Sequence, residues 1–198
     1  MDRVTDNGPS DKGSADDWLG DDAATAGVWI FGYGSLMWKP GFDHLTARHA
    51  LLHGYHRSLC IYSWVHRGTR ERPGLVFGLD RGGACKGFAF NVATDDEADV
   101  IDYLDARELV TDVYRRKRLM ITLENGRVLA WCYVVRRDHP QYAGRLPEDE
   151  LLKIIENSEG RSGHCRDYVL STVAHLEALG VNDATLKSVS GKLLNKAA

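Results

Sequence analysis

The stretch Val28-Trp29-Ile30-Phe31-Gly32-Tyr33-Gly34-Ser35-Leu36 decides the fold, because an apolar run meets a glycine-rich turn there. Residues 28–31 are large and apolar, which predicts a buried strand. Gly32, Gly34 and Ser35 then allow a sharp turn that points successive N–H groups into one concavity able to hold a carboxylate or phosphate. A side chain at Gly34 is expected to crowd this concavity and, if φ is positive there, to strain the backbone. The same spacing is also typical of a plain turn, and both interpretations stay open at this point.

The spacing of this stretch argues against two enzyme classes. In a dinucleotide-binding loop, a third glycine would stand where Met37 is, and a helix would run through Lys39-Pro40, where proline disfavours it. A nicotinamide-dependent oxidoreductase also requires a βαβ pattern, which the sequence lacks. Ser35 is not surrounded by a GxSxG motif, so a serine-nucleophile enzyme is not indicated either.

The remainder of the chain predicts an α+β fold with a mostly antiparallel, barrel-like sheet and flanking helices. Strand patterns come first and helix patterns gather in the C-terminal third, as expected of segregated α+β architecture. Thr94 and Glu97 have the spacing of a capping box and predict a helix start, and Asn125-Gly126 predicts a hairpin turn. The predicted strands are 28–31, 58–62, 74–79, 86–92, 114–123 and 128–136, and the further helices begin at Pro147 and span 167–179 and 184–194.

Composition indicates one globular domain behind an acidic tail. The protein has 198 residues, of which 43% are hydrophobic and 27% charged, as in ordinary folded proteins. Residues 1–26 hold seven Asp against Arg3 and Lys12 without periodicity, so we expect a disordered tail before a domain at 27–198. Outside the tail the net charge is about +2, too weak for a nucleic-acid footprint. No apolar run approaches the roughly 20 residues that cross a bilayer, so we expect no nucleic-acid and no membrane partner.

The cysteines indicate a reducing compartment. Cys60, Cys85, Cys132 and Cys165 form no CxxC pair, and the N-terminus lacks the basic flank and apolar stretch of a secretory signal. We therefore expect reduced, mostly buried thiols in a soluble cytoplasmic protein. No feature of the sequence predicts an oligomeric state.

Glu108 is the candidate catalytic residue that helical spacing brings out. It falls one turn beyond an apolar stripe, on the same helix face. The stripe consists of Val100, Ile101 and Leu104. A carboxylate there is either buried beside a cavity or paired with a nearby arginine, for which Arg107 and the basic run 115–118 are available. That run is typical of a solvated strand face, whose alternate members can also reach acidic groups, whereas Asp105 points off the stripe.

The histidines do not indicate a metal site. His49, His53 and His56 lie close in sequence, but no Glu follows the first His. Gly54 and the strand pattern beyond it also argue against a shared helix face. We therefore expect no metal and no cofactor.

One set of motifs occurs in a consistent order over about residues 28–190. It begins with Phe31-Gly32-Tyr33-Gly34-Ser35-Leu36-Met37-Trp38. It continues through Gly54-Tyr55-His56-Arg57, His66-Arg67-Gly68, Pro73-Gly74, Arg107-Glu108-Leu109 with Tyr114, His139-Pro140-Gln141-Tyr142, and Gly160-Arg161-Ser162-Gly163 with Tyr168. Together these motifs resemble the ChaC family, the glutathione-specific γ-glutamylcyclotransferases.

The resemblance implies a γ-glutamylcyclotransferase-like fold and an enzyme that converts glutathione to 5-oxoproline and Cys-Gly without a cofactor. It implies Glu108 as the general acid and base, because Arg107-Glu108-Leu109 matches the helix end that carries the family's catalytic glutamate. The substrate-binding residues that it implies are Ile30, Phe31, Gly32, Tyr33, Gly34, Ser35, Leu36, Arg57, Tyr114 and Tyr168.

Cys165 departs from the family pattern, which has Asn at this position. If that Asn holds the glycine end of glutathione, Cys165 weakens selectivity for the tripeptide. The flexible turn 160–163 and Tyr168 are then expected to close over this end. Two alternative functions are a cyclotransferase for other γ-glutamyl amino acids or amines, and a non-catalytic γ-glutamyl-binding module. The loop ending Leu36-Met37-Trp38 favours glutathione, and Glu108 argues against a pure binder.

Overall fold

Strand β1 (Gly27–Gly32) begins the described chain and confirms the strand predicted from the apolar run. The computed structural model describes residues 27–195. The acidic stretch 1–26, predicted as a disordered tail, lies outside the described residues. The second part of β1 is buried, so the strand carries the chain through the interior directly into the glycine-rich turn.

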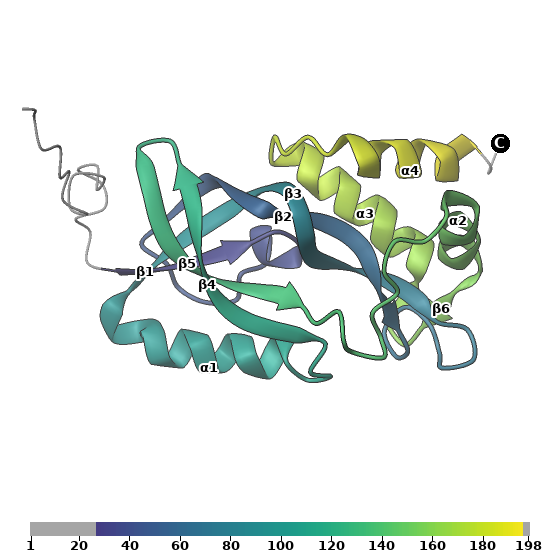
Figure 1. The fold of residues 1–198 in the computed structure, drawn as a ribbon, viewed down its shortest axis with the longest axis horizontal. Helices are drawn as coiled ribbons and strands as arrows, with labels where there is room; N and C mark the ends of the chain where they lie inside the picture. Colours follow the sequence, from purple (N-terminus) through teal and green to yellow (C-terminus); the bar gives the residue numbers. More distant parts are fainter. Residues whose placement is uncertain (1–26, 196–198) are drawn as a thin grey trace, which may run out of the picture.

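Five strands close into a barrel in the order β1–β3–β2–β4–β5 (Figure 1). The strands besides β1 are β2 (Thr46–Ser63), β3 (Gly74–Ala93), β4 (Tyr114–Leu123) and β5 (Gly126–Val135). Neighbouring strands are antiparallel except β1 and β5, whose short parallel pairing between Trp29 and Ala130 closes the ring. The α+β fold with a mostly antiparallel, barrel-like sheet is therefore confirmed, as is the hairpin predicted at Asn125-Gly126.

The long strands differ from the prediction. Stretches 74–79 and 86–92 belong to one strand, β3, and stretch 58–62 is only the end of β2. The ladder between β2 and β3 continues through the polar stretch 80–84 because register shifts absorb extra residues, one of them at Gly54 with φ +81°. The polar, glycine-rich stretch interrupts the hydrophobic alternation, so the sequence suggested two strands.

The helices cover the barrel from two directions (Figure 1). They are α1 (Glu97–Glu108), which lies along one side, and α2 (Glu148–Asn157), α3 (Cys165–Ala178) and α4 (Ala184–Asn195), which gather at the other end. One buried cluster fills the barrel around Phe31, a second lies under α1 around Leu104, and a third joins α2–α4 to Phe77 of β3. A short hairpin of β6 (Glu159–Gly160) and β7 (Gly163–His164) leads into α3.

The predicted helices are present, but the capping box at Thr94 is wrong. Residues Thr94–Asp96 form a short 3-10 turn, and α1 begins at Glu97 without a side-chain cap. The Glu97 carboxylate accepts a hydrogen bond from the Trp131 indole at 3.0 Å, so it is engaged with the barrel instead. Gly180 follows α3 in the left-handed conformation, φ +70°, as a helix-ending glycine does. Within residues 27–195, no helix is both long and apolar enough to cross a membrane.

Replacing Gly87 by alanine tests the close approach of β1 and β3. An ideal Cβ at Gly87 would lie 2.3 Å from the Gly32 carbonyl oxygen and 2.8 Å from the Phe31 ring, so the backbone would have to move. We expect Gly87→Ala to lower the free energy of unfolding by about 1–3 kcal/mol, measured by urea denaturation. Gly191→Ala in α4 is the control, because its Cβ meets nothing within 4 Å and alanine favours a helix by up to about 1 kcal/mol. Equal stabilities of the two variants would contradict this packing.

Candidate active site

Glu108 is the last residue of α1, one turn beyond Leu104 on the face that packs against the barrel. Its side chain is only 20% exposed, and the Arg107 guanidinium lies beside it, with Nε 3.2 Å from Oε1. Burial raises the pKa of the Glu108 carboxyl above its ordinary 4.5, and Arg107 offsets only part of that rise. The negative end of the helix dipole also disfavours a carboxylate here. The structure combines the two interpretations of Glu108: the carboxyl is largely buried, and it pairs with the neighbouring arginine.

Two tyrosine hydroxyls bond to the main chain of Phe77 in β3, and a third tyrosine hydroxyl bonds to one of them. Tyr114 donates its proton to the Phe77 carbonyl oxygen at 2.9 Å, and the Phe77 N–H donates to the Tyr168 hydroxyl oxygen at 3.3 Å. The Tyr33 and Tyr114 hydroxyls share a hydrogen bond, in which Tyr33 is the donor because Tyr114 has only one proton. Among residues 27–195, no acceptor is present for the Tyr168 proton, which is therefore available to a ligand.

The same tyrosines interact electrostatically with Glu108 and remain neutral. Burial is the main cause that raises the pKa of all three phenols, to about 12 for Tyr168. The Glu108 carboxylate adds to the rise in each of them, which places it within interaction range of all three hydroxyls. The phenols therefore stay protonated at neutral pH, which leaves Glu108 as the group of this cluster that can take up and release a proton.

The glycine-rich loop lies beside this cluster and is held to α1 by Arg107. The chain turns through Gly34 into a short 3-10 turn, η2 (Ser35–Met37). Arg107 donates to the Ser35 hydroxyl at 2.9 Å and to the Lys39 carbonyl oxygen at 3.0 Å. Within the described part of the chain, we find no acceptor for the N–H groups of Gly34 and Ser35. These donors are open to a ligand, as expected at the start of a helical turn.

The backbone strain that a positive φ at Gly34 would cause does not arise. Gly34 has φ −134°, outside the left-handed region, so its conformation does not require glycine on that account. An ideal Cβ at this position meets no atom within 4 Å. The space in front of the loop is therefore open.

Arg57 supports the loop from the protein side. Its side chain is 2% exposed, and its Nε donates to the Tyr33 carbonyl oxygen. Its Nη2 donates to the Lys86 carbonyl oxygen at 2.7 Å, and its Nη1 pairs with Asp183 at 3.0 Å. The guanidinium therefore bonds to protein acceptors and fixes the main chain where β1 leaves the barrel.

Other predicted loop residues bury their side chains in the core. Phe31 lies inside the barrel, Ile30 and Leu36 pack under α1, and a Cβ on Gly32 would lie 3.1 Å from the Leu36 Cβ. These residues can offer only their main chain to a ligand. The predicted residues that the structure brings together at one place are Glu108, Tyr33, Gly34, Ser35, Tyr114 and Tyr168.

A pocket of about 370 Å³ opens next to Tyr168. Its lining residues are Ser35, Trp38, Arg67, Asp167, Tyr168, Ser171 and Thr172. The Arg67 guanidinium lies over the Tyr168 ring, 4.9 Å from its centroid, and donates to the Ser162 carbonyl oxygen. The sequence did not single out Arg67 as a site residue, because it stands in a loop about a hundred residues before Tyr168 and only the motif order points to it.

The turn 160–163, expected to close over the substrate, is instead bound to segment 65–68. The Arg161 N–H donates to the Val65 carbonyl oxygen at 2.8 Å, and the Ser162 N–H donates to the His66 carbonyl oxygen at 2.9 Å. A Cβ on Gly160 would meet the main chain of that segment at 2.5 Å. The turn therefore packs tightly against the loop that carries Arg67 and helps to place it.

Comparison with known proteins identifies the family to which the chain belongs. A family model described as ChaC-like protein matches residues 28–195. The chain belongs to the ChaC-like family. It is 30% identical over 163 residues to the glutathione-specific γ-glutamylcyclotransferase of Escherichia coli (strain K12), covering 82% of this chain and 71% of that protein. It is 33% identical over 158 residues to glutathione-specific γ-glutamylcyclotransferase 1 of Mus musculus, covering 77% and 71%.

A solved structure shows that the fold is shared. The crystal structure of a γ-glutamyl cyclotransferase specific to glutathione from yeast matches with a TM-score of 0.76 at 21% identity. The match covers 87% of this chain and 100% of that chain. The predicted γ-glutamylcyclotransferase-like fold is therefore confirmed for this ChaC-like chain.

Cys165, the departure from the ChaC pattern, does not face a ligand. Its side chain is fully buried, and its Sγ accepts the Leu75 N–H at 3.2 Å and donates to the Leu75 carbonyl oxygen at 3.3 Å. An Asn amide offers the same donor and acceptor, so position 165 links the start of α3 to β3. The expectation that this residue holds the glycine end of the substrate is wrong, because none of its side chain is exposed.

The histidines of this ChaC-like chain lie apart on β2. His49 packs against the Phe88 ring with centroids 4.5 Å apart, whereas His56 Nδ1 bonds to the Gly82 carbonyl oxygen at 3.0 Å. Among the residues that the structure describes, no group of three or more His, Cys, Asp or Glu side chains is arranged to hold a metal ion. The four cysteines are buried and form no disulfide, as predicted.

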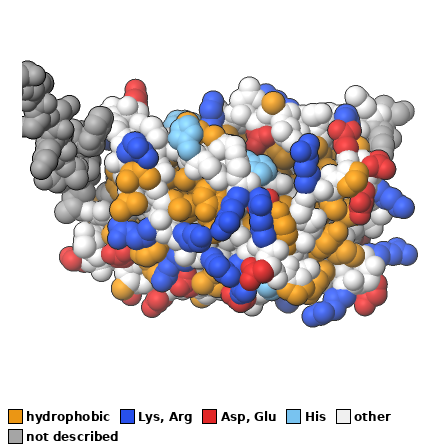
Figure 2. All heavy atoms as spheres, viewed as in Figure 1, with side chains coloured by type: hydrophobic (Ala, Val, Ile, Leu, Met, Phe, Trp, Pro, Cys, Tyr) orange, Lys and Arg blue, Asp and Glu red, His pale blue; other side chains and the backbone are white. Residues whose placement is uncertain are grey.

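The basic run of β4 contacts α1 and the segment after β5. Arg116 pairs with Asp105 of α1 at 2.6 Å and lies over the Trp131 ring, whereas Arg115 pairs with Asp138 at 3.3 Å. On the face drawn in Figure 2, Lys and Arg side chains gather over the end of β5, among hydrophobic ones. Asp105 is therefore part of a structural ion pair, in agreement with its place off the apolar stripe.

Substitutions at position 165 test its role as a link between α3 and β3. Cys165→Asn should keep the free energy of unfolding close to that of the wild type, because the amide bonds to the same Leu75 groups. Cys165→Ala removes both contacts and leaves buried peptide groups unpaired, which should cost about 1–3 kcal/mol. Urea denaturation measures both values, and an equal loss for the two variants would contradict this assignment.

Proposed function

We propose that the protein is a γ-glutamylcyclotransferase that cleaves glutathione into 5-oxoproline and Cys-Gly, with Glu108 as general acid and base. The observation that carries the proposal is a carboxyl group buried at a helix end beside an open glycine-rich loop. Membership of the ChaC-like family and the names of the bacterial and mouse relatives support the substrate. The chemistry requires no cofactor. We place it in the cytoplasm, where buried, unpaired thiols such as these persist.

In the proposed reaction the α-amine of the γ-glutamyl group attacks its own γ-carbonyl carbon. A C–N bond forms and closes a five-membered lactam, and the C–N bond to the cysteine nitrogen breaks. Because both reacting groups belong to one substrate, the protein must hold the glutamyl chain folded back on itself. Such orientation can contribute about 7–11 kcal/mol to lowering the barrier.

Glu108 balances the protons of this reaction. The substrate amine is an ammonium ion at neutral pH and must lose a proton before it attacks, and the cysteine nitrogen must gain one as it leaves. The Glu108 carboxylate takes the first proton and returns it to the leaving nitrogen. The attacking nitrogen loses a second proton as the lactam forms, and the same carboxylate passes it to the amine of Cys-Gly, which ends as an ammonium ion. Because burial raises its pKa, the Glu108 carboxylate is a stronger base than an ordinary carboxylate, which favours removal of the first proton.

The loop and the tyrosines fit the glutamyl half of the substrate. The N–H groups of Gly34 and Ser35 can hold the α-carboxylate in a nest of main-chain donors. The available Tyr168 proton can bond to the γ-carbonyl oxygen, where negative charge develops during attack. Tyr114 closes the inner wall with its hydroxyl bonded to the protein. Arg57 acts indirectly, by fixing the main chain that leads into this loop.

The pocket beside Tyr168 fits the Cys-Gly half. It adjoins the glutamyl site through Ser35 and Tyr168, which belong to both. The Arg67 guanidinium lines this pocket and can pair with the glycine carboxylate, the group that distinguishes the far end of glutathione. Cys165 takes no part in this recognition because it is fully buried and does not line the pocket.

Glu108→Gln tests the assignment of the acid–base residue. The purified wild type should release 5-oxoproline from glutathione, and the variant should turn over at least about 100-fold more slowly with little change in KM. In the wild type, kcat/KM should fall on the acid side as Glu108 becomes protonated, above pH 4.5 because its pKa is raised. The residual activity of the variant should lack this limb. Asp102→Asn, at an exposed position of the same helix, is the control, and near-normal turnover of Glu108→Gln would exclude Glu108 from the chemistry.

The same assay separates the alternative functions. Release of 5-oxoproline from γ-glutamyl-alanine at a rate equal to that from glutathione would favour a cyclotransferase for other γ-glutamyl amino acids. Binding of glutathione without any product would favour a non-catalytic γ-glutamyl-binding module.

Arg67→Met tests how the far end of the substrate is recognised. Losing a charge-assisted bond of about 1.5–3 kcal/mol should raise KM for glutathione roughly ten- to hundredfold, with kcat nearly unchanged. The matched control is γ-glutamyl-cysteinyl-glycinamide, which lacks the glycine carboxylate and should be cleaved with the same KM by wild type and variant. A KM increase of similar size for both substrates would show that Arg67 acts on the shape of the pocket and not on the carboxylate.

A further inference from the structure

The segment between Glu108 and Tyr114 contains a strained residue. Residues 109–113 join the end of α1 to the start of β4 and so connect the two side chains. Asp112 has φ +56°, a left-handed conformation that no other non-glycine residue adopts within residues 27–195. Such a residue persists only where its surroundings hold it, and strained residues cluster at functional sites.

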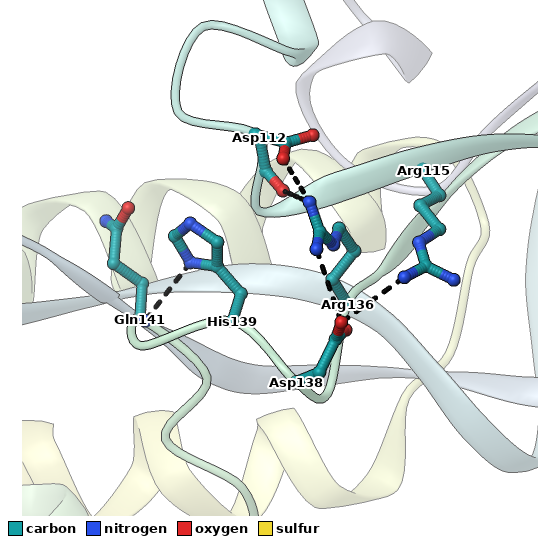
Figure 3. Close-up of polar contacts among 6 residues, drawn as sticks. All are labelled: Asp112, Arg115, Arg136, Asp138, His139 and Gln141. Carbon is teal, nitrogen blue, oxygen red and sulfur yellow. Dashed lines mark hydrogen bonds and ion pairs between the residues drawn. The ribbon is translucent and has the colours of Figure 1, made fainter.

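Arg136, the residue after β5, holds Asp112 in place (Figure 3). Its Nη1 pairs with the Asp112 carboxylate and also donates to the Asp112 carbonyl oxygen at 3.4 Å. Its main-chain N–H donates to the Val113 carbonyl oxygen at 2.8 Å, and the Val113 side chain is buried. One residue directly after the neighbouring strand therefore bonds to both the main chain and the side chain of this segment.

We propose that Asp112 and Arg136 are positioning residues for the reaction, and that their ion pair sets where Glu108 stands relative to the tyrosine hydroxyls. This inference rests on the proposed function of Glu108. The pair acts through the connecting segment: the Asp112 N–H donates to the Leu109 carbonyl oxygen at 3.0 Å, and the Leu109 N–H donates to the Asp105 carbonyl oxygen at 2.9 Å. A displacement of Asp112 is thereby passed to the last turn of α1.

Glu108 is sensitive to such a displacement because its burial depends on the elements around it. The titratable and charged groups that face it are Arg107 of α1, Tyr33 of the loop after β1, Tyr114 of β4 and Tyr168 of α3. All of them remain when the Asp112–Arg136 pair is broken, but the carboxyl group gains access to water, which lowers the pKa of a buried carboxyl. The acid limb of the pH profile then moves to lower pH.

Asp138 provides a matched control because it binds the same guanidinium from outside the segment. Its Oδ2 lies 3.2 Å from Arg136 Nη2 and 3.3 Å from Arg115 Nη2 (Figure 3). Its side chain is 60% exposed, close to the 71% of Asp112. A substitution at Asp112 or at Asp138 removes one exposed carboxylate from Arg136. Only the substitution at Asp112 breaks the ion pair that binds segment 109–113 to Arg136.

The experiment measures kcat, KM and the pH profile of 5-oxoproline release from glutathione for Asp112→Gly, Arg136→Met, Arg136→Lys and Asp138→Asn. Glycine accepts the left-handed conformation, so Asp112→Gly removes the carboxylate without adding strain. We expect it to lower kcat roughly ten- to hundredfold, the scale of misplacing a reacting group by about 1 Å, and to leave KM within about twofold. Its acid limb should move to lower pH. Arg136→Met should behave alike, and Arg136→Lys, which keeps the charge, should show a smaller effect.

Asp138→Asn should keep the kcat and the pH profile of the wild type. A change in the melting temperature of Asp112→Gly, with kcat and the pH profile unchanged, would show a purely structural pair and overturn the proposal. Equal effects of Asp112→Gly and Asp138→Asn would overturn it too. If Arg136→Met does not fold, Asp112→Gly decides, because its side chain is exposed. A wild type that releases no 5-oxoproline overturns the proposed function together with this inference. An active wild type with an unaffected Asp112→Gly variant overturns this inference alone.

Discussion

The burial of one carboxyl group at the end of a helix is the constraint on which the rest of the site depends. Glu108 is shielded from water and stands at the negative end of α1, and the Arg107 guanidinium beside it offsets only part of the resulting rise in pKa. The closed barrel provides the shielding wall. Strand β1 leads into Tyr33, β4 begins with Tyr114, and α3 brings Tyr168, so three separate elements carry the tyrosines that interact electrostatically with the carboxyl group.

Two arginines hold the glycine-rich loop from opposite sides. Arg57 fixes the Tyr33 carbonyl oxygen from the protein side, and Arg107 holds the Ser35 hydroxyl from α1. Arg107 also pairs with Glu108, which a guanidinium can do at the same time because it has five N–H donors. The position of the loop and the charge of the carboxyl group are therefore coupled. Arg107 is therefore the side chain that connects the loop with the Glu108 carboxyl group.

The predictable part of this structure is the part encoded locally. Strand β4 lies at its predicted bounds, and the helical period placed Glu108 on the buried face of α1. The continuous course of β3 was missed, because the polar stretch 80–84 interrupts the hydrophobic pattern while the ladder continues. Contacts between distant segments, such as Arg67 on Tyr168, leave no spacing signal at all.

Residue 165 also shows that the role of a side chain cannot be predicted without its surroundings. This chain has Cys165 where the family pattern has Asn, which suggested a change in substrate selectivity, because a sequence shows the residue and not its surroundings. The fold buries this side chain against Leu75, so the exchange alters a link between α3 and β3. Likewise, the ion pair between Arg136 and Asp112, the residue with positive φ, joins two segments that only the barrel brings together.

The central claim is that Glu108 carries a raised pKa despite its arginine neighbour, and a titration of that carboxyl group tests it most directly. Glutamate labelled with ¹³C at the carboxyl carbon gives one resonance per side chain, and the Glu108 resonance is the one missing from Glu108→Gln. In the folded protein without substrate, this resonance should titrate with a pKa above the ordinary 4.5. A pKa at or below 4.5 would show that Arg107 outweighs burial, and would contradict the proposed role of Glu108 as a base strengthened by burial.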